Sequence, residues 1–407
     1  MATGVAMPSG AALACAACAG VIIFWSAILP SEPENLGAGS VYKIFTTAAY
    51  LARGGGIDNV IPVPPGGYAS PVFGNNGAAY SVANVGDFPP QLTLQDALAR
   101  SPNTAFLKLE EQTGVAPVVD MAVRMGLRSL ATTPAGVGDS VAEVAKAQNQ
   151  ASSTLGTTPT STLELATVGA TLASHGTWCP PTPIQSITDA AGAAVAVAEP
   201  ACSPVLPAAL ADTLMVGLSK DDQPAGTSAQ AAAAANWNRP IAAKTGTTED
   251  YKSAAFLGAT PQLAGAVITF DDSSAPRPIC DGTPPTTCPA GNIYGGKTPA
   301  RTFYQAMTAI LAGQPALGLP APDPRYLTVG RRDPVPPVVG RPVAAATAEL
   351  AGAGFQSTTT PIDSRAPAGT VIAQDPQGSA LAGAPIRLTI SSGSVPPPPP
   401  PPLAAPG

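Results

Sequence analysis

The sequence has few charged residues, few aromatic residues and a single histidine. Charged residues make up 11% of the 407 residues and their formal balance is -6, so the clustered Lys and Arg needed to bind a polyanion are missing. A Ser-His-Asp triad or a multi-histidine metal site would have to be built around His175 alone. We therefore predict no nucleic-acid partner, no metal and no cofactor, and we interpret His175 as a solvated loop residue.

Hydrophobic residues make up 45% of the chain, enough to bury one sizeable core and leave room for a smaller second domain. The six cysteines fall into three local pairs: Cys15 with Cys18, Cys179 with Cys202, and Cys280 with Cys288. The last two pairs suit disulfides, because closing a loop restricts the unfolded chain. Disulfides predict an oxidising compartment outside the cytoplasm. The alternative is that all six thiols are reduced.

The two ends of the chain differ from its middle. Residues 11–29 form an uncharged apolar run about long enough to cross a bilayer, which predicts a membrane anchor within a leader over residues 1–39. No Lys or Arg precedes Lys43, so the usual orientation signal is missing. At the other end the sequence predicts three parts: a Pro-rich linker over residues 313–334, a compact unit over residues 335–393, and a Pro-rich tail over residues 394–407.

Hydrophobic periodicity in residues 40–312 predicts an α+β domain. Apolar residues recur at helical spacing after Ser40 until the Gly54-Gly55-Gly56 run. Strands are expected over residues 241–247, 254–258 and 264–270, and further helices over residues 93–100, 104–112, 162–174, 207–218 and 301–311. The expected architecture is an antiparallel sheet with helices packed on it.

The pair Ser40 and Lys43 is the first candidate for catalysis. A serine hydroxyl is a weak nucleophile at neutral pH and needs a base within hydrogen-bond reach. Lys43 follows one helical turn after Ser40, and partial burial or a neighbouring cation would favour its neutral form. Alone, Ser-x-x-Lys is a weak signal, because many solvated helices carry it.

Two further motifs follow in order, Ser101-Pro102-Asn103 at a helix break and Lys244-Thr245-Gly246-Thr247 on an expected strand. Ser101 can relay a proton to a leaving amine, and Asn103 can hold Lys43 and a substrate amide. Lys244 adds positive potential, and Thr245 or Thr247 can bind a substrate carboxylate. Gly246 lets a substrate approach the strand closely. The backbone N–H groups of Ser40 and Thr247 are the expected oxyanion hole.

This ordered trio is typical of penicillin-binding proteins and class A β-lactamases, with Asp at the place of Pro102. The chain resembles the transpeptidase half of actinobacterial class A penicillin-binding proteins. Besides the trio, the matching stretches are Gly39-Ser-Val-Tyr-Lys-Ile-Phe, Ala97-Leu-Ala-Arg-Ser-Pro-Asn-Thr-Ala-Phe, Leu155-Gly-Thr-Thr-Pro-Thr-Ser-Thr-Leu-Glu-Leu-Ala, Ala225-Gly-Thr and Ala243-Lys-Thr-Gly-Thr-Thr. The resemblance implies the penicillin-binding/β-lactamase-like fold for residues 40–312.

The resemblance also implies a reaction. The serine would attack a D-Ala-D-Ala bond of a peptidoglycan stem peptide, and an amine or water would then accept the acyl group, giving cross-linking or carboxypeptidase activity. β-Lactams would acylate the same serine. Residues 335–393 resemble a PASTA domain, a small α/β module associated with peptidoglycan or β-lactam recognition, with Val338-Val-Gly at its start and Gln374-Asp-Pro before its last strand. A spacer without a ligand is the alternative for this unit.

The chain also departs from the family pattern. Neither a glycosyltransferase domain nor the strands expected before the serine helix is found, which predicts a truncated N-terminus and an unpaired sheet edge. Glu164, the one candidate for a β-lactamase-type base, matches a family helix and is interpreted as structural.

Three functions remain in competition. The first is an extracytoplasmic, membrane-anchored D,D-transpeptidase. The second is a truncated, inactive penicillin- or peptidoglycan-binding envelope protein acting through residues 335–393. The third is a β-lactamase.

Overall fold

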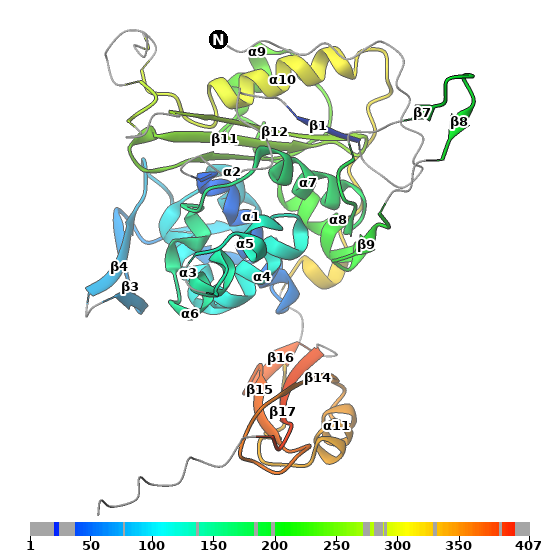
Figure 1. The fold of residues 1–407 in the computed structure, drawn as a ribbon. Coiled ribbons are helices and arrows are strands. Elements are labelled where there is room, and N and C mark those ends of the chain that lie inside the picture. Colours follow the sequence, from blue (N-terminus) through cyan, green and yellow to red (C-terminus); the bar gives the residue numbers. More distant parts are fainter. Residues whose placement is uncertain are drawn as a thin grey trace, which may run out of the picture. The chain divides into compact units, whose positions relative to one another are not determined.

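The computed structural model describes residues 20–23, 37–75, 78–135, 138–182, 186–196, 200–271, 277–280, 288, 291–328, 332–381 and 385–394 (Figure 1). The chain divides into two compact units, Met1–Thr328 and Val329–Gly407. Each unit has a hydrophobic core of its own. The mixture of a mainly antiparallel sheet with helices is the predicted α+β architecture.

The central sheet of the first unit has the strand order β1-β12-β11-β10. Its antiparallel part consists of Ala242–Thr247 (β10), Ser253–Ala259 (β11) and Leu263–Phe270 (β12). All three strands were predicted from the sequence. They are rich in small residues and almost wholly buried, so helices pack closely on both faces.

The edge of the sheet beside β12 is not unpaired, contrary to expectation. Gly20–Ile23 (β1) runs parallel to β12, with Gly20 opposite Leu263. The backbone groups of β12 thus find partners in a short apolar strand, which satisfies hydrogen bonds that would otherwise be lost. The predicted anchor over residues 11–29 otherwise lies outside the described residues. Within the residues that are described, no helix combines the length and the apolar character needed to cross a membrane.

Helices cover the two faces of the sheet (Figure 1). On one face lie Ala229–Ala234 (α9) and Thr298–Ile310 (α10). On the other lie Lys43–Ala52 (α1), Leu94–Arg100 (α2), Asn103–Thr113 (α3), Val115–Met125 (α4), Thr162–Ala173 (α7) and Ala208–Gly217 (α8). α1 is buried on nearly every side and is the central helix of this layer. It follows directly on a 3₁₀ turn, Gly39–Tyr42 (η1).

Smaller elements complete the first unit. Val60–Pro62 (β2) pairs antiparallel with Gln91–Thr93 (β5), and the chain between them forms a hairpin of Gly67–Asn75 (β3) with Ala78–Ala83 (β4). The short pairs are Thr177–Trp178 (β6) with Ser203–Pro204 (β9) and Ile187–Thr188 (β7) with Ala194–Val195 (β8). The short helices are Ser129–Thr132 (α5), Val141–Ala147 (α6), Ala151–Leu155 (η2) and Glu249–Tyr251 (η3).

Two disulfides lie in the first unit. Cys179 is bonded to Cys202 beside the β6–β9 pair, and Cys280 is bonded to Cys288. Cys15 and Cys18 lie outside the described residues. Both disulfides join the cysteines that the sequence pairs locally, and they favour an oxidising compartment.

The segment predicted as a linker over residues 313–334 is only partly a linker. The carbonyl oxygens of Tyr326 and Leu327 accept the N–H groups of Ile57 and Asp58 at 2.9 and 2.8 Å. The side chains of Leu319, Tyr326 and Leu327 pack against the main core. Prolines in this segment lack an N–H donor, but the backbone carbonyls and the apolar side chains of the segment can still contact the first unit. The first unit therefore extends to Thr328, and Pro324–Tyr326 (η4) is its last helical turn.

The second unit is a small α/β domain. Val343–Gly352 (α11) packs on a sheet of order β14-β17-β15, formed by Gln356–Ile362 (β14), Val371–Asp375 (β15) and Pro385–Ser391 (β17). Arg332–Pro334 (β13) pairs with Ser379–Leu381 (β16). Its core gathers Val338, Leu350, Phe355, Val371, Ile386 and Leu388. This unit is the small α/β module that the resemblance of residues 335–393 to a PASTA domain implies, with Gln374-Asp-Pro before the last strand.

Candidate active site

Three elements bring four of the predicted catalytic residues into one hydrogen-bonded cluster. Lys43 Nζ, at the start of α1, lies 2.7 Å from the carbonyl oxygen of Ser101, 3.1 Å from Ser101 Oγ and 2.8 Å from Asn103 Oδ1. Lys244 Nζ, on β10, donates to Ser101 Oγ at 2.9 Å and to the carbonyl of Thr245 at 3.1 Å. The Ser101 hydroxyl thus lies between two lysines that are 201 positions apart in sequence, at 43 and 244.

The turn between α2 and α3 explains why Ser101 and Asn103 face the same lysine. α2 ends when Ser101 adopts a left-handed conformation, with φ 63°, and its N–H donates to Ala97 O at 2.7 Å. Pro102 is extended and starts α3 at the next residue, because proline cannot continue a helix but suits its beginning. Asn103 Nδ2 donates to Ala83 O at 2.9 Å, which turns Oδ1 toward Lys43. Pro102 thus holds the turn without supplying a side chain to the site.

Ser40 is the predicted residue that stands apart from this cluster. It is the second residue of η1 and is partly exposed. Among the hydrogen bonds of the described residues, none involves its hydroxyl, so the predicted contact between Ser40 and Lys43 is not formed. The amine of Lys43 is directed instead at Ser101 and Asn103.

Two glycines set how closely η1 approaches β10. A Cβ on Gly39 would lie 2.4 Å from the backbone nitrogen of Thr247, and one on Gly246 would lie 1.9 Å from the carbonyl oxygen of Ala38. Gly39 also has φ +57°, a conformation that costs other residues free energy. Any side chain at either position would separate the serine turn from the strand.

The outer edge of β10 presents alternate N–H groups. The N–H groups of Lys244 and its even-numbered neighbours face β11. The N–H of Ala243 points to the other side and donates to Leu218 O at 2.9 Å. The N–H of Thr247 points the same way, toward the turn that carries Ser40. The N–H of Ser40 belongs to the first turn of a helix, where intrahelical acceptors are missing. These two N–H groups are the ones expected to form an oxyanion hole.

The two lysines are electrostatically distinct. Both side chains are 0% exposed. Burial lowers the pKa of Lys43 well below its usual value, and the positive charge of Lys244 lowers it further. Burial also lowers the pKa of Lys244, to about 8, while the carboxylate of Asp221 acts in the opposite direction. Burial and the charge of Lys244 thus both favour the neutral form of Lys43.

The substrate-binding candidates on β10 differ in their access. Thr245 is only 5% exposed, and its hydroxyl is hydrogen-bonded to Thr227 Oγ1. Thr247 is partly exposed, and its Oγ1 accepts the N–H of Gly295 at 3.1 Å. Asp221 and Thr227 are residues that the sequence did not single out for a role. Only the Ala225-Gly-Thr match hinted at Thr227, and no pattern in the sequence indicated Asp221.

Glu164 and His175 have structural surroundings. Glu164 accepts the N–H and the hydroxyl of Ser129 at 2.7 and 2.6 Å, which ties α7 to α5. His175 is 63% exposed and pairs with Asp212 at 2.6 Å on the surface. Neither residue contacts the lysine cluster.

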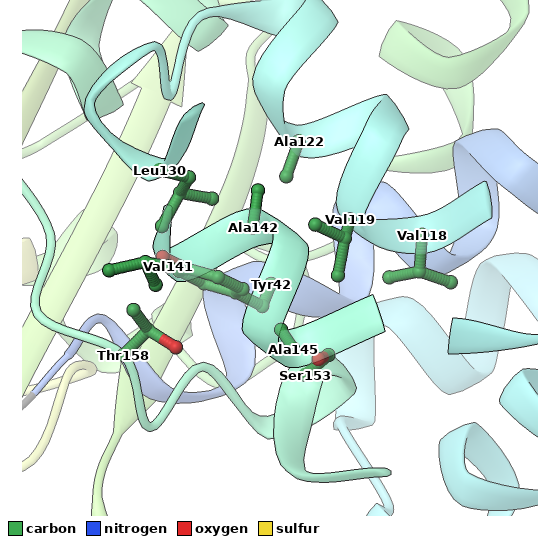
Figure 2. A pocket seen from close by; sticks show the side chains of 10 residues that line it. All are labelled: Tyr42, Val118, Val119, Ala122, Leu130, Val141, Ala142, Ala145, Ser153 and Thr158. Atoms are coloured by element: carbon green, nitrogen blue, oxygen red, sulfur yellow. The ribbon is translucent and has the colours of Figure 1, made fainter. Parts of the chain in front are cut away.

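A small hollow elsewhere in the first unit is shown in Figure 2. The residues around it are Tyr42, Val118, Val119, Ala122, Leu130, Val141, Ala142, Ala145, Ser153 and Thr158. They come mainly from α4 and α6, are mostly apolar and include none of the predicted site residues. We interpret the hollow as a packing gap and not as a substrate site.

A sheet flanked by helices, with a serine turn against one strand and two lysines around a second serine, defines the class of penicillin-recognising serine proteins. The penicillin-binding protein transpeptidase domain matches residues 34–273, and the chain belongs to this family. The PASTA domain matches residues 333–392.

Curated relatives are similar at low identity. Penicillin-binding protein 1A of *Aquifex aeolicus* is 30% identical over 181 residues, 44% of this chain and 22% of the relative. The *Mycobacterium tuberculosis* protein of the same name is 27% identical over 306 residues, 71% of this chain and 34% of the relative. The chain thus spans about a third or less of the length of these relatives.

Solved structures support the fold. PonA1 of *Mycobacterium tuberculosis*, solved alone and in complex with penicillin V, has a TM-score of 0.59 at 25% identity, over 74% of this chain and 76% of PonA1. Penicillin-binding protein 1A of *Haemophilus influenzae* has a TM-score of 0.56 at 20% identity, over 72% of this chain and 46% of that one.

Proposed function

We propose that this chain is a serine D,D-transpeptidase that cross-links peptidoglycan stem peptides through an acyl-enzyme at Ser40. The observation that carries the proposal is the Lys43–Ser101–Lys244 cluster, which lies beside the serine turn and the Lys-Thr-Gly strand. The complex of PonA1 with penicillin V supports β-lactams as ligands of the same site.

In the first step, Ser40 Oγ attacks the carbonyl carbon of the D-Ala-D-Ala bond and its proton passes to neutral Lys43. Burial and the charge of Lys244 lower the pKa of Lys43, which favours the neutral amine that this transfer requires. The N–H groups of Ser40 and Thr247 stabilise the oxyanion that forms. A hydrogen bond of about 3 Å between Ser40 and Lys43 forms as the substrate binds, since catalytic contacts often tighten only in the complex.

In the second step, the C–N bond breaks and D-alanine leaves as an amine. Ser101 gives its proton to that nitrogen and takes one from Lys43, with Lys244 donating to the same oxygen and holding it in place. An amine from a neighbouring strand, or water, then attacks the ester and restores Ser40. The amine gives a cross-link and water gives carboxypeptidase activity.

A labelled penicillin tests the assignment. The folded protein is incubated with a fluorescent penicillin, and the adduct is detected on a gel and located by peptide mass spectrometry. We expect labelling on Ser40, no labelling in Ser40→Ala, and unchanged labelling in Ser140→Ala, which removes a helix-capping hydroxyl far along the chain. Labelling that survives Ser40→Ala would overturn the mechanism.

Two other outcomes separate the alternatives. An adduct that persists for many minutes excludes a β-lactamase, which must release the acyl group rapidly. A folded wild-type chain that forms no adduct would leave the envelope-binding function of residues 335–393, which muropeptide binding to that unit would then test.

A further inference from the structure

The end of the β3–β4 hairpin meets the start of α3 at Asn84. The N–H of Thr104, in the first turn of α3, donates to Asn84 Oδ1 at 3.0 Å. Asn84 Nδ2 donates to Thr104 Oγ1 at 3.0 Å and to Pro64 O at 3.2 Å. The backbone N–H of Asn84 donates to Gly66 O at 2.8 Å. Asn84 thus joins both ends of the hairpin to the helix that begins with Asn103.

The side chain of Asn84 supplies a cap that the residue before α3 does not. That residue is Pro102, whose side chain makes no capping hydrogen bond. The N–H groups in the first turn of a helix have no acceptor within the helix, and a buried one must find a partner elsewhere. Thr104 is 0% exposed, so its N–H can be satisfied only inside the protein, and Asn84 Oδ1 is the acceptor. Asn84 therefore caps α3 from another part of the chain.

The partners of the Asn84 amide fix its orientation. Pro64 O can only accept and must face Nδ2, whereas the Thr104 N–H can only donate and must face Oδ1. The Thr104 hydroxyl gives its own hydrogen to Pro64 O at 2.9 Å and accepts one from Asn84 Nδ2. The amide thus uses its oxygen and both of its hydrogens. The side chain of Asn84 is held in one position, and the end of β4 is held with it.

Ala83, the residue before Asn84, contacts the active site. Its carbonyl oxygen accepts Asn103 Nδ2 at 2.9 Å. Ala83 is exposed, so water competes for this bond and the bond contributes little on its own. Such a bond orients the Asn103 amide only if the carbonyl of Ala83 is kept in place by other contacts. The hydrogen bonds of Asn84 are those contacts, because they tie the end of β4 to the start of α3.

The orientation of the Asn103 amide decides what remains free on Lys43. Because Ala83 O takes a hydrogen from Nδ2, Asn103 Oδ1 faces Lys43 Nζ at 2.8 Å. Ser101 O is a second acceptor, at 2.7 Å from the same nitrogen. In the neutral amine these two acceptors take both hydrogens, so the lone pair is left for a hydroxyl that donates. A flipped Asn103 would instead present an N–H group to Lys43 and compete for that lone pair.

We propose that Asn84 is a positioning residue of the site: by fixing the end of β4 against the start of α3, it holds the oxygen of Asn103 toward Lys43. The lone pair of Lys43 is thereby kept free to accept a proton. The inference deepens the proposed function and rests on it for the effect on the rate of acylation. The orientation of Asn103 itself can be measured in a protein that is not acylated.

The first experiment compares the rate of acylation by benzylpenicillin in the wild type and three variants. We expect Asn84→Ala to slow acylation about tenfold or more, because small displacements of reacting groups cost up to about 100-fold. Asn84→Ser keeps a hydroxyl that can accept the Thr104 N–H and should show a smaller loss. Asn59→Ala is the matched control, since it removes a bond of 2.8 Å from Asn59 Nδ2 to Tyr50 Oη, and should react as the wild type. Wild-type rates in the folded Asn84 variants would overturn the proposal.

A double-mutant cycle separates positioning from a general loss of stability. Asn103→Ala has no amide to orient, so adding Asn84→Ala or Asn84→Ser to it should change the rate by less than about twofold. Adding Gly246→Ala, which acts on the opposite side of the site, should slow Asn103→Ala further and so shows that an additional loss is detectable. If the Asn84 variants slow Asn103→Ala as much as they slow the wild type, Asn84 does not act through Asn103 and the proposal is wrong.

The side-chain amide of Asn103 reports its position without acylation. It is followed by NMR of the protein labelled with ¹⁵N-asparagine, and its signal is assigned by its loss in Asn103→Ala. We expect the two Nδ2 hydrogens to differ in chemical shift in the wild type, to approach each other in the Asn84 variants, and to stay unchanged in Asn59→Ala. An unchanged Asn103 signal in the folded Asn84 variants would refute the positioning role. A wild type that shows the expected signal but no acylation would refute only the proposed function.

Discussion

At the scale of single residues, the first unit buries several charged groups, and only some of them belong to the site. The charge of Lys244 lowers the pKa of Lys43 and opposes the rise that burial causes in the pKa of Asp221. Glu110 on α3 is 0% exposed and does not act on the pKa of either lysine. Burial raises the pKa of Glu110 well above its usual value, and the backbone of Thr154 offsets only part of that rise.

Glu110→Gln is expected to stabilise the protein in a pH-dependent way. The folded state keeps the Glu110 proton to higher pH than the unfolded state does, so this group's contribution to stability is present below pH 4 and is lost as the pH rises toward the folded pKa. Relative to Glu110→Gln, the wild type should lose up to about 1.4 kcal/mol per pH unit within that window. Urea unfolding at pH 4, 6 and 7.5 measures the difference.

The neighbouring Glu111 offers a matched control. Its carboxylate accepts the hydroxyl of Ser70 at 2.6 Å and that of Tyr68 at 3.0 Å, and so holds the β3–β4 hairpin to α3. Glu111→Gln should therefore lower the free energy of unfolding. It should not show the stabilisation that increases with pH and is expected for Glu110→Gln. A constant difference between wild type and Glu110→Gln at all three pH values would show that Glu110 is ionised in the fold.

At the scale of elements, the site depends on the contact between η1 and β10. Two helices and a strand supply the chemical groups, but the separation of serine turn and strand is set by Gly39 and Gly246. Small residues elsewhere on the sheet serve packing, whereas these two allow backbone to meet backbone.

Gly246→Ala is expected to disable the site without removing any reacting group. The new methyl group would overlap the carbonyl of Ala38 and push the serine turn away from the Thr247 N–H. A displacement of about 1 Å costs about 100-fold in rate, and acylation by fluorescent penicillin should fall by that order. Gly318→Ala, where a Cβ meets nothing within 4 Å, should react as the wild type. Equal rates for the two variants would contradict this account of the glycines.

At the scale of the whole molecule, the chain consists of two units with separate cores. The boundary lies after Thr328, because Leu319, Tyr326 and Leu327 still pack on the first core. The Pro-rich composition of residues 313–328 is compatible with a linker and with a segment packed on the first unit. The apolar side chains of these residues favour the packed segment.

Two truncations test where the first unit ends. A chain that stops at Thr328 should keep the acylation rate and the thermal midpoint of the first unit. A chain that stops at Ala312 loses the bonds from Ile57 and Asp58 and the burial of two leucines, and should be less stable by about 3 kcal/mol or more. Calorimetry of both chains makes the comparison, and equal midpoints would place the boundary near residue 312 instead.

The sequence by itself determined the main elements and the order of the motifs. Periodicity over α1, α7 and β10–β12 reflects which residues are apolar, and that pattern survives folding because each face must be buried. The spacing of the motif residues also indicated their chemistry. Ser40 and Lys43, for example, are one helical turn apart and so belong to the same face of a helix. The local cysteine pairs were equally visible.

Only the tertiary structure decided how these parts meet. The turn at Ser101 directs one hydroxyl to two lysines that lie far apart in the sequence. The pairing of β1 with β12 and the packing of Leu327 on the first unit are likewise contacts between distant segments. Such contacts depend on which apolar surfaces and backbone groups remain exposed after the helices and strands have formed. A local stretch of sequence therefore does not predict them.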